Sequence, residues 1–224
     1  MNHVHRHLTG AGRFIADEAL PGMGHMVVLR ADVAHGVIAG LDVAEARAMP
    51  GVRTVLTAEE LAREGIGRMG CREVVEGING PMIEPRRPVL AEGKVVHVGQ
   101  PIAAIVADTE AEAQSAAEAV EIDIDPLPAV IDPTTATEAP AIWPEAPDNR
   151  ALIWEGGNVE ETKRLTASAA HVVEVKVEHP RIAISPIETR GCLGDWQGGQ
   201  YTLITPSQGV VSLRHAMAEV LGCP

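Results

Sequence analysis

Aromatic residues are scarce in this sequence: one Phe, one Tyr and three Trp make up 2% of its 224 residues. Hydrophobic residues nevertheless account for 46% of the chain. A core built from this composition is aliphatic and depends on Ala and Val for most of its volume. The length allows one large domain or two small ones, and the composition is that of a soluble globular protein.

Clustered positive charge is also missing, since 18 Lys and Arg stand against 31 Asp and Glu and the formal net charge is −13. Nucleic acids and anionic membranes bind through grouped basic side chains, so neither is expected as a partner. The N-terminus has no charged start followed by an apolar stretch, and no apolar run approaches the length of a membrane span. We therefore predict a cytoplasmic protein.

The cysteines are too few and too far apart for a structural framework. Cys71, Cys192 and Cys223 are an odd number and form no C-x-x-C pair. Neither an iron–sulfur or zinc site nor a set of disulfides is indicated, and buried reduced thiols are expected.

Two motifs that resemble ligand sites receive structural interpretations. His3, His5 and His7 alternate and would share one face of a strand, which suits a metal, but a solvated terminus is the preferred interpretation. Residues 65–70, GIGRMG, match the spacing G-x-G-x-x-G. They follow a predicted helix instead of linking a strand to a helix, so they are not predicted to bind a dinucleotide.

Residues 98–133 specify local structure more fully than any other stretch. Residues 102–107 form an unbroken apolar run, which is typical of a strand covered on both faces. Thr109 and Glu112 form a capping box, with Asp108 as an alternative cap, at the start of a helix with a stripe of Ala. Residues 120–124 then alternate apolar and acidic side chains, as in a half-buried strand. A strand, helix, strand unit favours a parallel strand pair with a right-handed crossover.

Shorter patterns predict the other elements. Asp42 and the pair Thr57 and Glu60 predict caps of two short helices. A turn at 197–199 predicts a hairpin between the last two strands. The expected strands are 25–31, 36–42, 52–57, 95–98, 173–177, 181–185, 191–196 and 200–205, and the further expected helices are 159–167 and 210–221.

The chain divides into a first domain at 1–132, a Pro-rich linker at 133–157 and a last segment at 158–224. The last segment is too small to form an independent core. Its final helix, 210–221, has an apolar face that needs another layer to cover it. We therefore expect a partner chain or a longer parent protein.

Four stretches together resemble the molybdenum-binding large subunit of the xanthine dehydrogenase, aldehyde oxidase and aerobic carbon monoxide dehydrogenase family. The stretch at 98–133 carries the most specific likeness. The resemblance implies an α/β fold with an α+β mixed sheet, in which a hammerhead-like domain precedes an incomplete molybdopterin-binding domain. The four stretches are LTGAGRFIADEALPGMGH, VGQPIAAIVADTEAEAQSAAEAVEIDIDPLPAVIDP, SPIETRGCLGDW and YTLITPSQGVVSLRHAMAEVLGCP.

Thr205-Pro206-Ser207-Gln208 is similar to the family segment whose glutamine donates a hydrogen bond to the apical oxo ligand of molybdenum. The resemblance implies that Gln208 binds the cofactor, and an amide can donate there without adding charge. Without the family, a Gln between a strand and a helix is more often a surface or capping residue. Pro206 and Ser207 stand where relatives often have Ser-Thr.

Residues 187–190, Ile-Glu-Thr-Arg, are similar to a family segment near the substrate pocket, which makes Glu188 and Thr189 candidate pocket residues. A strand end with Glu188 and Arg190 paired to neighbours is at least as compatible with the sequence. The family's glycine-rich cofactor segment and its distant glutamate base have no counterpart here. No complete catalytic set and no metal ligand are therefore expected in this chain.

The resemblance implies a subunit or fragment of a molybdenum-dependent hydroxylase, an oxidoreductase that hydroxylates an aldehyde, an N-heterocycle or a similar small molecule. Molybdopterin would be shared with a partner chain, and iron–sulfur centres and FAD would lie on other subunits. Alone, the chain would be inactive. The alternatives are a non-catalytic interaction subunit of such a complex and a truncated or disrupted gene product.

Overall fold

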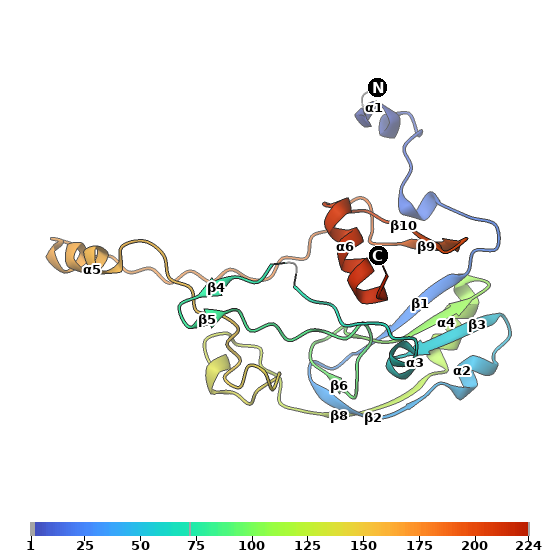
Figure 1. Ribbon diagram of the computed structural model, residues 1–224, viewed down its shortest axis with the longest axis horizontal. Coiled ribbons are helices and arrows are strands. Elements are labelled where there is room, and N and C mark those ends of the chain that lie inside the picture. Colours follow the sequence, from blue (N-terminus) through green and yellow to red (C-terminus); the bar gives the residue numbers. More distant parts are fainter. Residues whose placement is uncertain (1–2, 72, 224) are drawn as a thin grey trace. The chain divides into compact units, whose positions relative to one another are not determined.

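The computed structural model describes residues 3–71 and 73–223 and divides the chain into two units (Figure 1). The first unit combines the residues up to Leu20 with Trp154–Gln208. The second unit combines Pro21–Ile153 with the residues from Gly209 onward. Each unit is described by itself below.

The second unit holds most of the regular structure. It contains, in chain order, β1 (His25–Arg30), β2 (Gly36–Asp42), α2 (Ala44–Ala48), β3 (Val52–Thr57), α3 (Ala58–Arg63), β4 (Glu76–Gly77), β5 (Gly80–Pro81), β6 (Lys94–Val95), β7 (Pro101–Ala107), α4 (Glu110–Glu118), β8 (Glu121–Pro126), a 3-10 turn at Ala136–Glu138 and α6 (Val210–Leu221). The strands expected from the sequence at β1, β2, β3, β7 and β8 are therefore confirmed, whereas β6 is shorter than the expected 95–98.

Within the described residues, two antiparallel sheets of three strands each organise this unit, with strand orders β1-β7-β3 and β6-β2-β8. In the first sheet Ile105 of β7 lies opposite Val27 of β1 and Val55 of β3. Both edges of β7 are thus occupied. The expected parallel pairing of β7 with β8 is wrong, because β8 instead pairs antiparallel with β2 in the second sheet.

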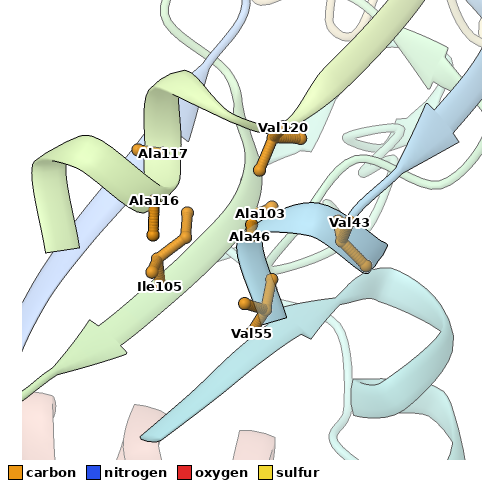
Figure 2. Close-up of a cluster of buried hydrophobic side chains, with 8 residues drawn as sticks. All are labelled: Val43, Ala46, Val55, Ala103, Ile105, Ala116, Ala117 and Val120. Carbon is orange, nitrogen blue, oxygen red and sulfur yellow. The ribbon is translucent and has the colours of Figure 1, made fainter. Parts of the chain in front are cut away.

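The main core lies where α4 and α2 pack on the first sheet (Figure 2). Alanines on α4 are buried, which lets the helix axis approach the sheet closely as the sequence predicts. Ile105 is fully buried beneath them. The cluster consists of Val43, Ala46, Val55, Ala103, Ile105, Ala116, Ala117 and Val120.

Capping boxes begin α4 and α3 as the sequence predicts. The Thr109 hydroxyl accepts a hydrogen bond from the Glu112 amide at 3.2 Å, and the Glu112 carboxyl accepts one from the Thr109 amide at 3.0 Å. At α3 the amide of Thr57 donates to Glu60 at 2.8 Å. Asp42 accepts from the amide of Ala44, although the residue at the cap position of α2 is Val43 and not Asp42.

The proline-rich stretch after residue 132 forms a compact coil. Asn149, with a left-handed backbone at φ 55°, organises it. Its amide nitrogen donates to the carbonyls of Ala136, Ala139 and Pro140, and its amide oxygen accepts from the amide of Ile142 at 2.8 Å.

Helix α6 ends at Gly222, whose φ of 63° is the left-handed conformation expected at a helix C-terminus. The Gly67 amide donates to the Val220 carbonyl at 2.7 Å, and Arg86 forms an ion pair with Glu219. Residues 65–70 therefore contact a helix C-terminus and do not begin a helix.

The first unit contains α1 (His3–Leu8), a 3-10 turn at Ile15–Asp17, α5 (Val159–Ser168), β9 (Leu193–Gln197) and β10 (Gln200–Ile204). The predicted β9–β10 hairpin is confirmed, and its turn uses Gly198 and Gly199 at φ 59° and 86°. The expected strands 173–177 and 181–185 are wrong, since no adjacent strand pairs with them among the described residues. The expected solvated terminus is exposed at residues 5–10, and it begins with helix α1, in which residues two apart do not share a face.

Candidate functional site

Gln208 is the last residue of the first unit and lies in the short link between β10 and α6. Its side chain is exposed. Gly209, which follows it, occupies the N-cap position of α6 with an extended backbone. The structure thus places Gln208 at a strand-to-helix junction, as the sequence predicts.

A side-chain hydrogen bond fixes the start of this link. The Thr205 hydroxyl donates to the carbonyl of Gly191 at 2.8 Å. The neighbouring hairpin register pairs Ile204 with Leu193, and Leu193 is buried. The segment that leads to Gln208 is therefore held against the residues that follow Glu188.

Glu188 connects this region to the start of the chain. Its carboxyl oxygen Oε1 accepts a hydrogen bond from the backbone amide of Ile15 at 3.0 Å. Gly191 lies close to the same residue, because a Cβ there would be 3.0 Å from Ile15 Cγ2. Three segments that are distant in the sequence thus meet in the first unit, around residues 15, 188–191 and 205.

The structure separates the roles of the candidate residues. Glu188 is half-buried and makes the bond to Ile15, whereas Thr189 and Gln208 are exposed. Among the described residues, no hydrogen bond joins Gln208 to Glu188 or Thr189. Glu188 therefore holds two segments together, and sequence reasoning missed its partner because 173 positions separate it from Ile15.

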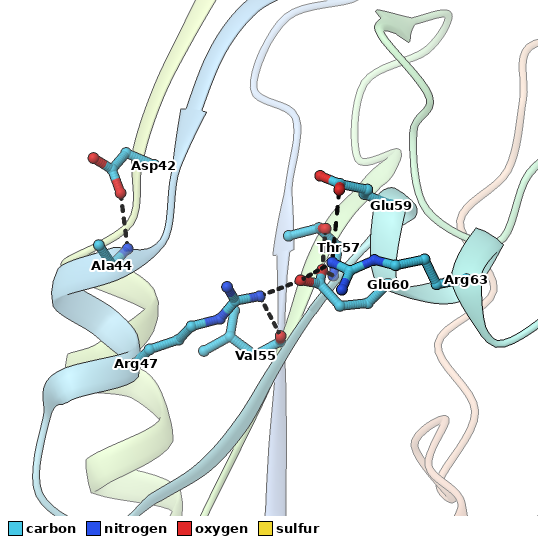
Figure 3. A network of polar contacts seen from close by, with 8 residues as sticks. All are labelled: Asp42, Ala44, Arg47, Val55, Thr57, Glu59, Glu60 and Arg63. Carbon is cyan, nitrogen blue, oxygen red and sulfur yellow. Dashed lines mark hydrogen bonds and ion pairs between the residues drawn. The ribbon is translucent and has the colours of Figure 1, made fainter.

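A second polar cluster lies in the second unit around Glu60 (Figure 3). Glu60 forms ion pairs with Arg47 and with Arg63, and Arg47 also donates to the Val55 carbonyl at 3.1 Å. Hydrogen bonding by the Thr57 hydroxyl, with a further contribution from Arg47, lowers the pKa of Glu60 to about 2. The capping box of Thr57 and Glu60 was the one local pattern that pointed to this cluster.

The same cluster borders an open groove of about 520 Å³, lined by residues of β2, α2 and the start of α3. The charged side chains of the cluster pair with one another. Arg47 forms an ion pair with Glu60, and Arg63 forms ion pairs with Glu59 and Glu60. The arrangement joins α2 to α3 and β3. It therefore acts as a structural link between these elements.

Residues 3–71 and 73–223 contain no group of three or more His, Cys, Asp or Glu placed to hold a metal ion. No helix in this described part is long and apolar enough to cross a membrane. The cysteines are free, but Cys71 and Cys192 are exposed and Cys223 is half-buried. The expectation of buried thiols is wrong for the first two, because both lie in irregular surface segments.

Comparison with known families gives two adjacent matches. Residues 9–128 match the sequence model described as "Aldehyde oxidase and xanthine dehydrogenase, a/b hammerhead domain". Residues 142–224 match the one described as "Molybdopterin cofactor-binding domain". Gln208, Glu188 and Thr189 all lie inside the second match.

Among curated relatives, the chain is similar to subunit gamma of the 6-hydroxypseudooxynicotine dehydrogenase complex of Paenarthrobacter nicotinovorans, with 34% identity. It is also similar to the carbon monoxide dehydrogenase large chain of Hydrogenophaga pseudoflava, with 32% identity. Each alignment covers 98% of this chain and 28% of the relative. The chain thus spans little more than a quarter of the length of these relatives.

Solved structures show the same relationship. The chain matches reconstituted CO dehydrogenase from Oligotropha carboxidovorans with a TM-score of 0.86 and 30% identity. It matches quinoline 2-oxidoreductase from Pseudomonas putida 86 with a TM-score of 0.81 and 32% identity. Both matches cover 99% of this chain and 28% of the solved chain.

Proposed function

This chain belongs to the aldehyde oxidase and xanthine dehydrogenase family, and from that membership we propose that it is one part of a molybdenum hydroxylase. Under this proposal residues 1–132 form the hammerhead domain, 133–157 a linker and 158–224 the first part of a molybdopterin-binding domain. A second polypeptide, here called the companion chain, carries the part of the large subunit outside this chain. The complex is a cytoplasmic oxidoreductase.

The observation that carries the proposal is the position of Gln208. It lies exposed at a strand-to-helix junction inside the segment that matches the cofactor-binding domain. Its amide can donate through Nε2 and accept through Oε1 without adding a net charge. These properties fit a residue that binds a polar group of a molybdopterin cofactor, and Gln208 is the one residue of this chain that we assign to cofactor binding.

A bound molybdopterin supplies the redox chemistry of oxidative hydroxylation. The residues of this chain hold and orient the segment that carries Gln208. The Thr205 hydroxyl ties the segment before Gln208 to the Gly191 carbonyl, and Glu188 ties the neighbouring segment to Ile15. This support keeps the Gln208 amide in place, which matters because catalytic hydrogen bonds depend on preorganised donors.

The substrate class follows from what the relatives are named for. Their names include nicotine, 6-hydroxypseudooxynicotine, carbon monoxide and aldehydes. We propose an aldehyde, an N-heterocycle or a similar small molecule as the substrate. Electrons would leave through iron–sulfur centres and FAD on other subunits of the complex.

The proposal is tested in the complex of this chain with the companion chain and the other subunits. Gln208→Ala should lower turnover of a responsive substrate from a panel of aldehydes and N-heterocycles by roughly 10-fold to 100-fold. Subunit stoichiometry should stay unchanged. The matched control is Gln200→Ala, which removes another exposed glutamine from β10 and should leave turnover unaltered.

Unaltered turnover in the Gln208→Ala complex would show that this glutamine takes no part in the reaction. The chain would then be a non-catalytic interaction subunit, and the companion chain would carry its own cofactor-binding glutamine. Molybdenum content measured on both complexes separates lost cofactor binding from lost chemistry.

A further inference from the structure

Residues 65–70, Gly-Ile-Gly-Arg-Met-Gly, have the glycine spacing of a ligand-binding motif, but the proposed function gives them no role. The structure gives them a different neighbour, the C-terminal end of α6. The Gly67 amide donates a hydrogen bond to the Val220 carbonyl at 2.7 Å. The last carbonyls of a helix have no partner inside the helix, and this bond satisfies one of them. The segment therefore caps α6 from outside the helix.

Glycine at two of the motif positions permits this close approach. A Cβ at Gly67 would lie 3.3 Å from the Val220 carbonyl oxygen, closer than side-chain carbons normally come. A Cβ at Gly70 would lie 3.0 Å from Glu84 Oε1 and 3.2 Å from Arg86 Nη2. The glycine spacing thus fits contact with the end of a helix and with the guanidinium of Arg86.

Arg86 adds a charged contact to the same helix end. Its guanidinium forms an ion pair with the carboxylate of Glu219 on α6. The segment that carries Arg86 is joined to the glycine motif, because Met69 and Arg87 exchange backbone hydrogen bonds of 2.7 and 3.0 Å. A positive charge also interacts favourably with the C-terminal end of a helix. Two contacts, from Gly67 and from Arg86, therefore fix this end of α6 on the second unit.

Helix α6 connects these contacts to Gln208. The helix is continuous from Val210 to Leu221, and the Leu213 amide donates to the Gly209 carbonyl at 3.0 Å at its start. Gln208 is joined to Gly209 by a peptide bond. A helix of this length is a rod of about 18 Å. The position of its C-terminal end therefore determines where the residue attached to its N-terminal end is held.

We propose that Gly67 and Arg86 are positioning residues for Gln208 and act on it through α6. This inference rests on the proposed function, because it takes Gln208 as the residue that binds the cofactor. A donor contributes most to a reaction when it is held in place beforehand, and a small displacement lowers the rate. The hammerhead domain thus contributes to the cofactor site through the end of a helix.

The first test exchanges the charges of the ion pair in the full chain. Arg86→Glu and Glu219→Arg each bring like charges together, whereas Arg86→Glu/Glu219→Arg restores opposite charges. The two side chains are 49% and 57% exposed, so the variants should keep the fold. Hydrogen exchange of the Gly67 amide should accelerate roughly 5-fold in either single variant and return to the natural rate in the double variant.

The side-chain amide of Gln208 reports whether the effect reaches the other end of α6. Its NMR signals should shift in both single variants and return in the double variant. A contact that merely stabilises the helix end would not move them. The matched control is Arg68→Glu, which breaks an ion pair with Glu92 on the same glycine segment and away from α6. The signals of Gln208 should stay unchanged in this control.

The second test measures turnover of the assembled enzyme. Arg86→Glu should lower kcat roughly 5-fold to 10-fold and leave KM unchanged, because the Gln208 amide acts mainly in the transition state. The charge exchange should restore kcat. In the Gln208→Ala background the same Arg86→Glu change should cause no further loss, since two residues that act through one contact are not additive.

Unmoved Gln208 signals in the single variants, or a double variant that does not restore them, would overturn the inference. An additive loss of kcat in the Gln208→Ala background would overturn it as well, because Arg86 would then act independently of Gln208. Unaltered turnover in Gln208→Ala alone contradicts the proposed function. The NMR measurement on the full chain still decides whether Arg86 positions Gln208, so the two failures are distinguishable.

Discussion

The backbone amide of Ile15 donates a hydrogen bond to the carboxyl of Glu188 at 3.0 Å, across 173 positions of the sequence. This contact joins the start of the chain to the segment that precedes the β9–β10 hairpin. Gly191 lies next to the same isoleucine, where a larger side chain would crowd Ile15 Cγ2. The segment around Ile15 is thus a structural part of the first unit.

Removal of the Glu188 carboxyl should weaken the contact between Ile15 and the segment that contains Glu188. Glu188→Ala leaves the Ile15 amide without its acceptor and should cost about 1–2 kcal/mol locally. Exchange of the Ile15 amide, followed by NMR, should accelerate about 10-fold, as expected for 1.4 kcal/mol. Glu188→Gln, which keeps an acceptor oxygen, should restore most of the protection, and Thr189→Ala should have no effect. An unchanged rate in Glu188→Ala would contradict the assignment of this bond.

The core of the second unit should depend strongly on Ile105. This side chain is 0% exposed at the centre of the β1-β7-β3 sheet. Ile105→Ala should lower the free energy of unfolding by about 2–5 kcal/mol, through lost burial and the cavity that remains. The matched change Ile131→Ala, at a side chain that is 87% exposed, should shift it by less than about 0.5 kcal/mol. Urea unfolding followed by circular dichroism measures both.

The capping box of α4 should contribute measurably to stability. Thr109→Ala removes the hydroxyl that accepts the Glu112 amide and should cost about 1 kcal/mol. Ser115→Ala, at an exposed position inside the same helix, should be neutral or slightly stabilising, because Ala is the better helix former. Equal unfolding midpoints for the two variants would show that the cap does not stabilise the fold.

The Glu60 cluster should make stability depend on pH in the acidic range. Hydrogen bonding by Thr57, together with Arg47, lowers the folded-state pKa of Glu60 to about 2 from its ordinary value of 4.5. Its contribution is therefore complete above pH 4.5 and is lost as the pH falls towards 2. Glu60→Gln should be less stable than the natural chain by about 1 kcal/mol at pH 7, and this difference should shrink between pH 4.5 and 2.

Denaturant unfolding at several pH values between 3 and 7 checks this prediction. Glu59→Gln is the control, since the Glu59 side chain is 82% exposed and its ion pair with Arg63 is long, at 3.7 Å. A constant difference between Glu60→Gln and the natural chain across this range would contradict the role of the cluster.

Local sequence signals predicted individual elements well. The apolar run at β7, the capping box at Thr109 and the alternation in β8 each describe a few neighbouring residues, and each element is present. The position of Gln208 between β10 and α6 also followed from local pattern. Its role in binding a cofactor remains a proposal, because it came from the family resemblance.

Pairing between elements was less predictable. The sequence favoured a parallel pair of β7 and β8, but β1 and β3 occupy both edges of β7 and leave β8 to pair with β2. The valines at 173–177 have the alternation of a strand, yet no strand lies beside them within the described residues. Alternation reports which side chains share a face and carries no information on the neighbouring strand.

The sequence by itself determined the helices and most strands, because caps, turns and apolar periodicity act between residues a few positions apart. It also determined the family, through stretches long enough to be specific. Only the tertiary structure decided that β7 is the central strand of its sheet, that Glu188 holds Ile15 and that Thr205 holds Gly191. These contacts join residues far apart in the chain, and they form because packing brings together donors and acceptors that no local pattern connects.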